Sequence, residues 1–237
     1  NPNTVFGPAV RNLAFGRTAG IIDGRPFLWT ALGAAFLERT PRWDAAASAG
    51  LRKWYEAYTA WLTTSAKGLA EKKAGNNHST WWAAQVAAYA GFAGDRPARE
   101  MVWRHYRDVL LPGQFRPDGG APREEARTRS LSYSAMNLDA FTLLCRMAAV
   151  AGTDLWRFRA PNGASLDRAV AYLAPYVVQP EKWTLPQIRP YEPEGNYFLA
   201  LSAAGFNQPA YGVRQPGLAA PARPWRLLVE MLLQTSR

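Results

Sequence analysis

Two polar clusters contain the side chains best suited to chemistry. The first is the stretch NNHSTWWAAQ at residues 76–85, which follows a glycine-containing loop. At about 100° per residue, one helical face would carry four of its side chains: His78, Trp81, Trp82 and Gln85. With Asn77 at the mouth of that face, the group could bind a flat, polar ligand such as a sugar ring. The structural alternative is that the asparagines end the loop and both tryptophans pack inward.

The second cluster, residues 118–137, combines acids, arginines and a tyrosine. Arg127 and Tyr133 would lie about 120° apart on an ideal helix, so both reach one pocket only if the chain is irregular before Tyr133. A guanidinium near a phenol favours the phenolate and lowers its pKa. The alternative is a solvated helix surface with two ion pairs at helical spacing, Glu124 with Arg127 and Glu125 with Arg129.

Together the clusters provide Asn77, His78, Arg127 and Tyr133, a set suited to removing a proton next to a carboxylate. Abstraction of H5 from a uronic acid requires that the charge of the C6 carboxylate be neutralised, which amide donors and a guanidinium can do. A tyrosine can then take the C5 proton and return a proton to the O4 leaving group. This scheme needs no metal or other cofactor. With two histidines and Cys145 alone, no Cys/His metal constellation can be assembled.

The amino-acid composition limits the classes of partner that the protein could bind. The 237 residues carry 28 Lys and Arg against 18 Asp and Glu, a formal charge of +10, which favours an acidic partner. The apolar share of 48% excludes charge-driven disorder. The basic residues are scattered rather than gathered in a stripe, so nucleic acid is the least favoured partner. The longest weakly polar run, residues 81–94, is shorter than the roughly 20 residues of a membrane helix. A membrane surface and an acidic polysaccharide are the other candidates for the acidic partner.

Helical periodicity accounts for most of the chain, and strand alternation is absent. The pattern predicts helices over residues 26–39, 44–65, 79–92, 95–111, 130–151, 165–176, 194–204 and 224–234. Glycine and proline predict loops over residues 1–25, 66–77 and 112–123. We therefore expect an all-α fold of stacked antiparallel helix pairs, curved into a toroid, as a single domain over residues 1–237.

The two clusters resemble the alginate lyase superfamily of polysaccharide lyases. Residues 76–85 are similar to its Asn-Asn-His-(Gly/Ser)-Thr-Trp…Gln segment, and residues 123–137 to its Glu-x-x-Arg-Thr…Tyr-Ser…Asn segment. Residues 1–24 resemble its Asn-Pro…Gly-Arg…Gly-Ile loop, and residues 154–156 and 169–176 follow in the expected order. The resemblance spans residues 1–176, and the two motifs in tandem are specific.

The resemblance implies an (α/α) toroid, here an incomplete barrel, that is secreted or periplasmic and cleaves a 1,4-linked uronan by β-elimination. It implies that Asn77 and Arg127 neutralise the carboxylate, that Tyr133 is the acid and base, and that His78 assists or serves as a second base. We expect no cofactor, no nucleic acid or membrane partner, and a monomer. Seven further residues are expected to contact the substrate: Asn76, Trp81, Trp82, Gln85, Glu124, Arg17 and Asn137.

Two departures from the family pattern and two other functions stay open. The loop at Asn1 begins where family domains already have helices, so we expect the first helices of the toroid to be missing. Pro8 stands where relatives often have Gln. A non-catalytic binder of acidic polysaccharide would use the charge and the aromatics alone. A glycoside hydrolase would need two carboxylates about 5–10 Å apart, and its candidates are Glu71, Asp118, Glu124, Glu125, Asp139 and Asp154.

Overall fold

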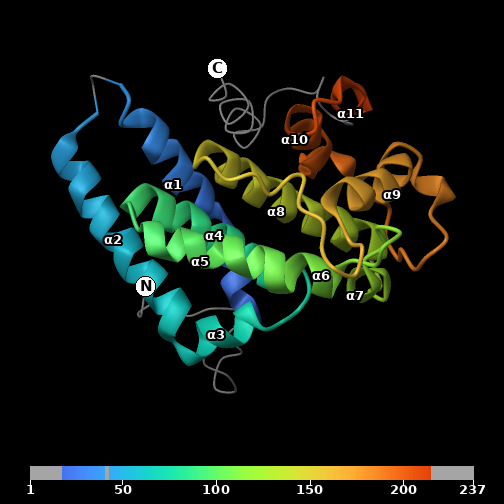
Figure 1. Ribbon diagram of the computed structural model, residues 1–237, viewed down its shortest axis with the longest axis horizontal. Coiled ribbons are helices and arrows are strands. Elements are labelled where there is room, and N and C mark those ends of the chain that lie inside the picture. The colour runs from blue at the N-terminus through green and yellow to red at the C-terminus, as the bar shows by residue number, and fades with distance from the viewer. Residues whose placement is uncertain (1–17, 41–42, 215–237) are drawn as a thin grey trace. The chain divides into compact units, whose positions relative to one another are not determined.

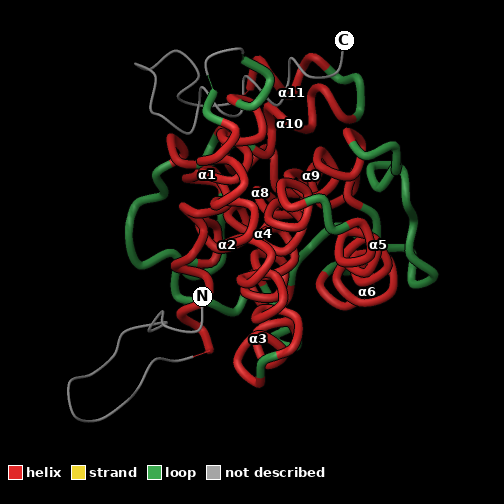
Figure 2. Tube along the Cα trace, turned by 90° about the vertical axis from the view of Figure 1, so that its left-hand side faces the viewer, coloured by secondary structure: helices red, strands yellow, loops and turns green. Residues whose placement is uncertain are grey.

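Helices make up all the regular structure of the described residues. The computed structural model describes residues 18–40 and 43–214 (Figures 1 and 2). Within them, besides the helices, there are only two isolated β-bridges. The chain divides between residues 104 and 105 into two compact units. The expectation of one domain over residues 1–237 stays a prediction.

The first unit is built around helix α4. Its elements are a 3-10 helix η1 (Thr18–Gly24), α1 (Arg25–Leu37), α2 (Ala45–Thr64), α3 (Ala66–Lys72), α4 (Asn77–Ala93) and α5 (Arg96–His105), whose last residue lies past the boundary. Helices α1, α2 and α3 all pack against α4, which is buried on nearly every side (Figure 1). A helix that is apolar all round belongs in a core. Its first turn, where the first cluster lies, is therefore held by its neighbours.

Aromatic rings fill the contact between α2 and α4. The Tyr58 ring stacks on the Tyr89 ring at a centroid distance of 5.2 Å, and the Tyr55 ring lies 4.9 Å from that of Tyr89. Burial raises the pKa of Tyr55 to about 12 and that of Tyr89 well above its usual value. These tyrosines are therefore neutral packing residues at any physiological pH.

The second unit is built around helix α8. Its elements are a π-helix η2 (Tyr106–Leu110), α6 (Leu111–Gln114), α7 (Pro122–Glu125), α8 (Ser130–Val150), α9 (Leu166–Val178), 3-10 helices η3 (Pro180–Lys182) and η4 (Pro193–Gly195), α10 (Phe198–Gly205) and α11 (Pro209–Arg214). Helices α7, α9 and α10 contact α8 (Figure 1). Its buried side chains include Cys145, whose thiol donates to the Tyr106 hydroxyl at 3.3 Å.

Most predicted helices are present, and their ends follow from local chemistry. The helix expected over residues 44–65 is α2, with Asp44 accepting from the backbone of Ala46 at 2.9 Å. The helices expected from residues 26, 130 and 165 correspond to α1, α8 and α9. The predicted start of α4 at residues 79–80 was wrong, because the cap is Asn76. The expected helix over residues 224–234 lies outside the described residues, as do residues 1–17 of the loop expected over residues 1–25. The rest of that loop was predicted wrongly, because residues 18–24 form η1 and α1 begins at Arg25.

Three other boundaries differ from expectation. Residues 66–77, expected as a loop, contain α3, because Ser65 caps it and Gly68 lets it approach α2: a Cβ there would lie 2.1 Å from the Leu62 carbonyl oxygen. The helix expected over residues 95–111 is interrupted by η2 and continues as α6, which contains Pro112 and ends at Gln114. The helix expected from residue 194 begins at Phe198, because Pro193–Gly195 forms its own turn.

Candidate active site

The first turn of α4 fixes Asn77 and His78. The side-chain oxygen of Asn76 accepts from the backbone N–H of His78 at 3.2 Å, and its backbone oxygen accepts from the Ser79 hydroxyl at 2.9 Å. A capped first turn gives the side chains that follow it a defined direction. Asn77 is fully buried, whereas the side chain of His78 is 19% exposed. His78 can therefore meet a ligand.

A buried carboxylate holds the imidazole of His78. Oε1 of Glu71, on α3, lies 2.7 Å from Nδ1 of His78, and the Glu71 side chain is only 3% exposed. An ionised carboxylate only accepts hydrogen bonds, so the ring nitrogen that faces it, Nδ1, is the donor of this contact and Nε2 points away from Glu71. Sequence reasoning counted Glu71 only among carboxylates for a hydrolase. The signal that could have found it is the Ser65 cap, which predicts α3.

Arg127 and Tyr133 meet in the second unit. Helix α7 ends at Glu125 and α8 begins at Ser130, so residues 126–129 are not helical. This break between the two helices is the irregularity that Arg127 and Tyr133 need in order to reach one pocket, because they would lie about 120° apart on an ideal helix. The Arg127 guanidinium carbon lies 4.0 Å from the centroid of the Tyr133 ring, a cation–π contact. Both side chains are partly exposed. A fixed positive charge thus lies beside a phenol that a ligand can reach.

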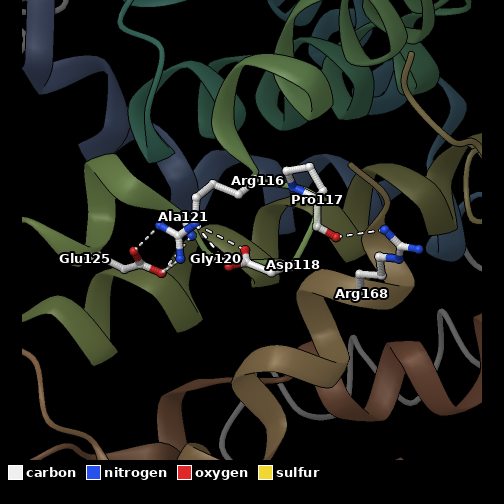
Figure 3. Close-up of polar contacts among 7 residues, drawn as sticks. All are labelled: Arg116, Pro117, Asp118, Gly120, Ala121, Glu125 and Arg168. Atoms are coloured by element: carbon white, nitrogen blue, oxygen red, sulfur yellow. Dashed lines mark hydrogen bonds and ion pairs between the residues drawn. The ribbon is translucent and has the colours of Figure 1, made fainter. Parts of the chain in front are cut away.

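The ion pairs of the second cluster differ from those expected for a solvated helix surface. Glu125 does not pair with Arg129: its Oε2 lies 2.7 Å from Nη1 of Arg116 (Figure 3). Nε of Arg116 also donates to Asp118 at 3.2 Å, and Glu125 Oε1 accepts from the Ala121 N–H at 3.0 Å. In the part of the chain that the structure describes, Arg127 has no acidic partner. Its charge is therefore free to meet an anion.

The loop at residues 116–121 is also attached to α9. Figure 3 shows Arg168 reaching the Pro117 carbonyl oxygen, at 2.9 Å from Nη1. Gly119 has φ +98°, and a Cβ there would lie 2.3 Å from the Arg168 carbonyl oxygen. Only glycine fits both the backbone angle and this close approach. The loop before Arg127 is thus held at both ends.

Comparison with known proteins gives the family. The family model described as alginate lyase matches residues 1–183, which include all the candidate residues. The chain belongs to the alginate lyase family. A solved structure of an alginate lyase from Bacteroides ovatus is similar at a TM-score of 0.80 and 25% sequence identity over 94% of this chain. This likeness and the helices of the described residues confirm the expected all-α fold class. The chain spans 59% of that protein's length, and no curated protein matches it.

The expected substrate contacts of this alginate lyase family member are mostly buried. Gln85 donates to the Ile21 carbonyl oxygen at 3.1 Å, and the Trp82 indole donates to that of Leu62 at 3.0 Å. Asn137 donates to the Gln114 side chain at 2.9 Å. Trp81 is 3% exposed beneath the Arg25 guanidinium, and Glu124 is 1% exposed. Arg17 lies outside the described residues. Burial of the tryptophans corresponds to the structural alternative, inward packing.

The catalytic candidates of the alginate lyase motifs lie in two groups. Asn77 and His78 are in the first unit with Glu71, and Arg127 and Tyr133 are in the second. Residues 18–40 and 43–214 contain no group of three His, Cys, Asp or Glu side chains that could hold a metal ion. None of their helices has the length and apolar character needed to cross a lipid bilayer.

Proposed function

We propose that this alginate lyase family member cleaves 1,4-linked uronans by metal-independent β-elimination. The observation that carries the proposal is the guanidinium of Arg127 placed on the ring of Tyr133, with no acidic partner in the described chain. Membership of the family supports the same reaction. The products would be a new reducing end and a sugar with a C4=C5 double bond.

The proposed reaction moves one proton from C5 to the leaving oxygen. Arg127 neutralises the C6 carboxylate, which lowers the cost of the negative charge that develops when C5 loses its proton. Asn77, which was expected to share this role, is fully buried and makes no direct contact with the carboxylate in this proposal. Tyr133 takes that proton, the C4–O4 bond breaks, the C4=C5 bond forms, and O4 receives a proton from Tyr133. Glu71 fixes the tautomer of His78, so that Nε2 can accept a hydrogen bond or a proton.

Sugar stereochemistry sets the proposed substrate preference. In β-D-mannuronate and β-D-glucuronate, H5 and O4 lie on the same side of the ring, so one tyrosine serves as both base and acid. In α-L-guluronate, H5 is on the opposite side and a second base is required. His78 is the only imidazole of the two motifs. We therefore propose a preference for mannuronate or glucuronate linkages, with His78 as the base for any guluronate cleavage.

The buried residues of the motifs take supporting roles in this proposal. Gln85 and Trp82 hold α4 to its neighbours, and Asn137 holds α8 to α6. They therefore position the residues that meet the substrate. The proposal also includes a secreted or periplasmic monomer, because a polymeric substrate is met outside the cytoplasm, and the charge of +10 supports a polyanionic substrate.

The deciding experiment compares three polymers and two readouts. The chain is incubated with polymannuronate, polyguluronate and glucuronan while the ultraviolet absorbance of the unsaturated product and the number of new reducing ends are recorded. A lyase raises both signals together. A hydrolase would raise reducing ends without the chromophore. A non-catalytic binder would retain the polymers without changing either signal.

A further inference from the structure

The helix that carries Tyr133 receives its N-terminal cap from far along the chain. A helix leaves the N–H groups of its first turn without acceptors inside the helix. Arg129, at the N-cap position of α8, makes no side-chain hydrogen bond to this turn. The acceptors come from residues 183–189, which we call the capping segment.

Gln187 is the centre of this cap. The N–H of Ser130 donates to the Pro186 carbonyl oxygen at 2.9 Å. The N–H groups of Leu131 and Ser132 donate to Oε1 of Gln187 at 3.1 and 3.4 Å. Nε2 of Gln187 donates to the Ser132 hydroxyl at 2.9 Å and to the Arg189 carbonyl oxygen at 2.8 Å, and these two bonds fix the orientation of the amide. The next N–H, that of Tyr133, already has an acceptor within the chain's own turn, the Arg129 carbonyl oxygen at 3.0 Å.

The capping segment is anchored on both sides of Gln187. The Trp183 indole donates to the Ser130 hydroxyl at 2.7 Å and packs on the Tyr176 ring of α9 at 4.9 Å. On the other side, the Ile188 N–H donates to the Thr128 carbonyl oxygen at 2.9 Å. The segment therefore holds both the first turn of α8 and the residues that lead into it.

These contacts enclose the stretch on which the Arg127–Tyr133 pair depends. The guanidinium meets the ring only because residues 126–129 turn before α8 begins. Thr128 and Ser130, which the capping segment holds, lie between the two residues of the pair. A loosened first turn would change the direction of Tyr133 and its distance from Arg127. A misplacement of about 1 Å in such a group can cost on the order of 100-fold in rate.

We propose that Gln187 is a positioning residue for Tyr133 and Arg127. It acts through the backbone of α8 and does not touch the substrate. The inference rests on the proposed lyase function, and it lies beyond the family match, which ends at residue 183. The same reaction in this chain would then depend on a residue outside the stretch that the family model matches.

The test uses three substitutions in the whole chain. Gln187→Leu keeps the size of the side chain but removes both hydrogen-bonding groups. Gln187→Glu keeps an oxygen that accepts from Leu131 and Ser132, and a negative charge is favourable at a helix N-terminus. Gln179→Leu is the matched control, because Gln179 is exposed in the same unit. For each, kcat and KM on the preferred uronan, urea unfolding and amide hydrogen exchange of residues 130–133 are measured.

The expected result separates positioning from simple stability. In Gln187→Leu, the amide hydrogens of Leu131 and Ser132 should exchange with solvent faster than in the wild type. The value of kcat should fall roughly 10- to 100-fold with little change in KM, because the substitution disturbs the chemical step and not substrate binding. Gln187→Glu should restore most of kcat and the slow exchange, and the control should behave as wild type. A folded Gln187→Leu with wild-type kcat, or equal losses in the Leu and Glu variants, would overturn the proposal.

Two further arms keep the outcomes distinct. If Gln187→Leu does not fold, Gln187→Asn carries the test, since its side chain is one CH₂ shorter and draws the amide oxygen back from the Leu131 and Ser132 N–H groups. It should lower kcat with KM unchanged, and an unchanged kcat would count against the proposal. If the wild-type chain cleaves no uronan, the proposed function fails by itself. Amide exchange in Gln187→Leu then still decides whether Gln187 caps α8, and unchanged exchange overturns the inference.

Discussion

At the scale of single residues, Tyr133 gives the simplest test of proton transfer, because its hydroxyl is its only polar side-chain group. The ring contributes separately, through its contact with the Arg127 guanidinium at 4.0 Å. Removal of the hydroxyl therefore leaves the packing of the pair in place. Chemistry and binding can be measured apart at this position.

We expect Tyr133→Phe to abolish most turnover while polymer binding stays close to wild type. A general acid–base group typically contributes about 10²–10⁴-fold to the rate, and the loss should fall on kcat. Initial rates from ultraviolet absorbance and binding by calorimetry check this. Tyr176→Phe, at a partly exposed tyrosine of the same unit, is the control. Retention of more than about a tenth of kcat would remove Tyr133 from this role.

The pair of Glu71 and His78 predicts an effect that depends on the substrate. His78→Ala should reduce guluronate cleavage more than mannuronate or glucuronate cleavage, because only guluronate needs a base on the opposite side. Glu71→Gln should act in the same direction but more weakly, since its oxygen can still accept from Nδ1 while its charge is lost. The ratio of kcat/KM on the two block polymers measures this. Equal losses on both would return His78 to a purely orienting role.

At the scale of elements, close approach between segments decides what substitution the second unit tolerates. Gly119 and Gly152 both have positive φ, +98° and +79°. A Cβ at Gly119 would lie 2.3 Å from the Arg168 carbonyl oxygen, whereas a Cβ at Gly152 would have no atom within 4 Å. The two glycines therefore differ in their surroundings while sharing the need for a left-handed backbone.

We expect Gly152→Ala to lower the free energy of unfolding by about 1 kcal/mol, the cost of the backbone angle alone. Gly119→Ala should cost about 1–3 kcal/mol more, because the new methyl group must displace the backbone of α9. Urea denaturation of both variants measures the difference. Equal costs would mean that the loop at residues 116–121 can move away from Arg168 without penalty.

Sequence patterns predict elements whose signals are local. Asp44 and the apolar stripe after it are sufficient for α2, and the required irregularity before Tyr133 is present. Helix α3 was not predicted, because a glycine such as Gly68 usually indicates a loop. In this structure the missing side chain of Gly68 instead allows α3 to pack closely against the backbone of Leu62. The absence of α3 from the prediction also hid the Glu71–His78 contact. The cap from Gln187 joins residues 56 apart, and no local pattern reports such a pairing.

At the scale of the whole molecule, charge is the property that bears on the polymer. The chain carries a formal charge of +10 with only 19% charged residues, so the excess is carried by relatively few groups. A uronan has one carboxylate on every sugar. Attraction between the two acts before any specific contact forms and raises the rate of encounter.

We expect uronan binding to weaken steadily as salt is added, because the screening length falls from about 8 Å at physiological ionic strength to about 3 Å at 1 M. Titrations at several salt concentrations measure the effect. A neutral glucan of matched length should show no such dependence. An affinity for uronan that does not change with salt would mean that the net charge has no part in binding.

The cap on α8 also bears on the order in which the protein is made. Synthesis runs from the N-terminus, so α8 leaves the ribosome while Gln187, 56 residues beyond Leu131, has yet to be added. During that interval three amides of its first turn have only water as a partner. The surroundings of Tyr133 are therefore completed only after α9 has been made, by a segment that follows it. A nascent chain shorter than residue 187 can form the helix but not its finished N-terminus.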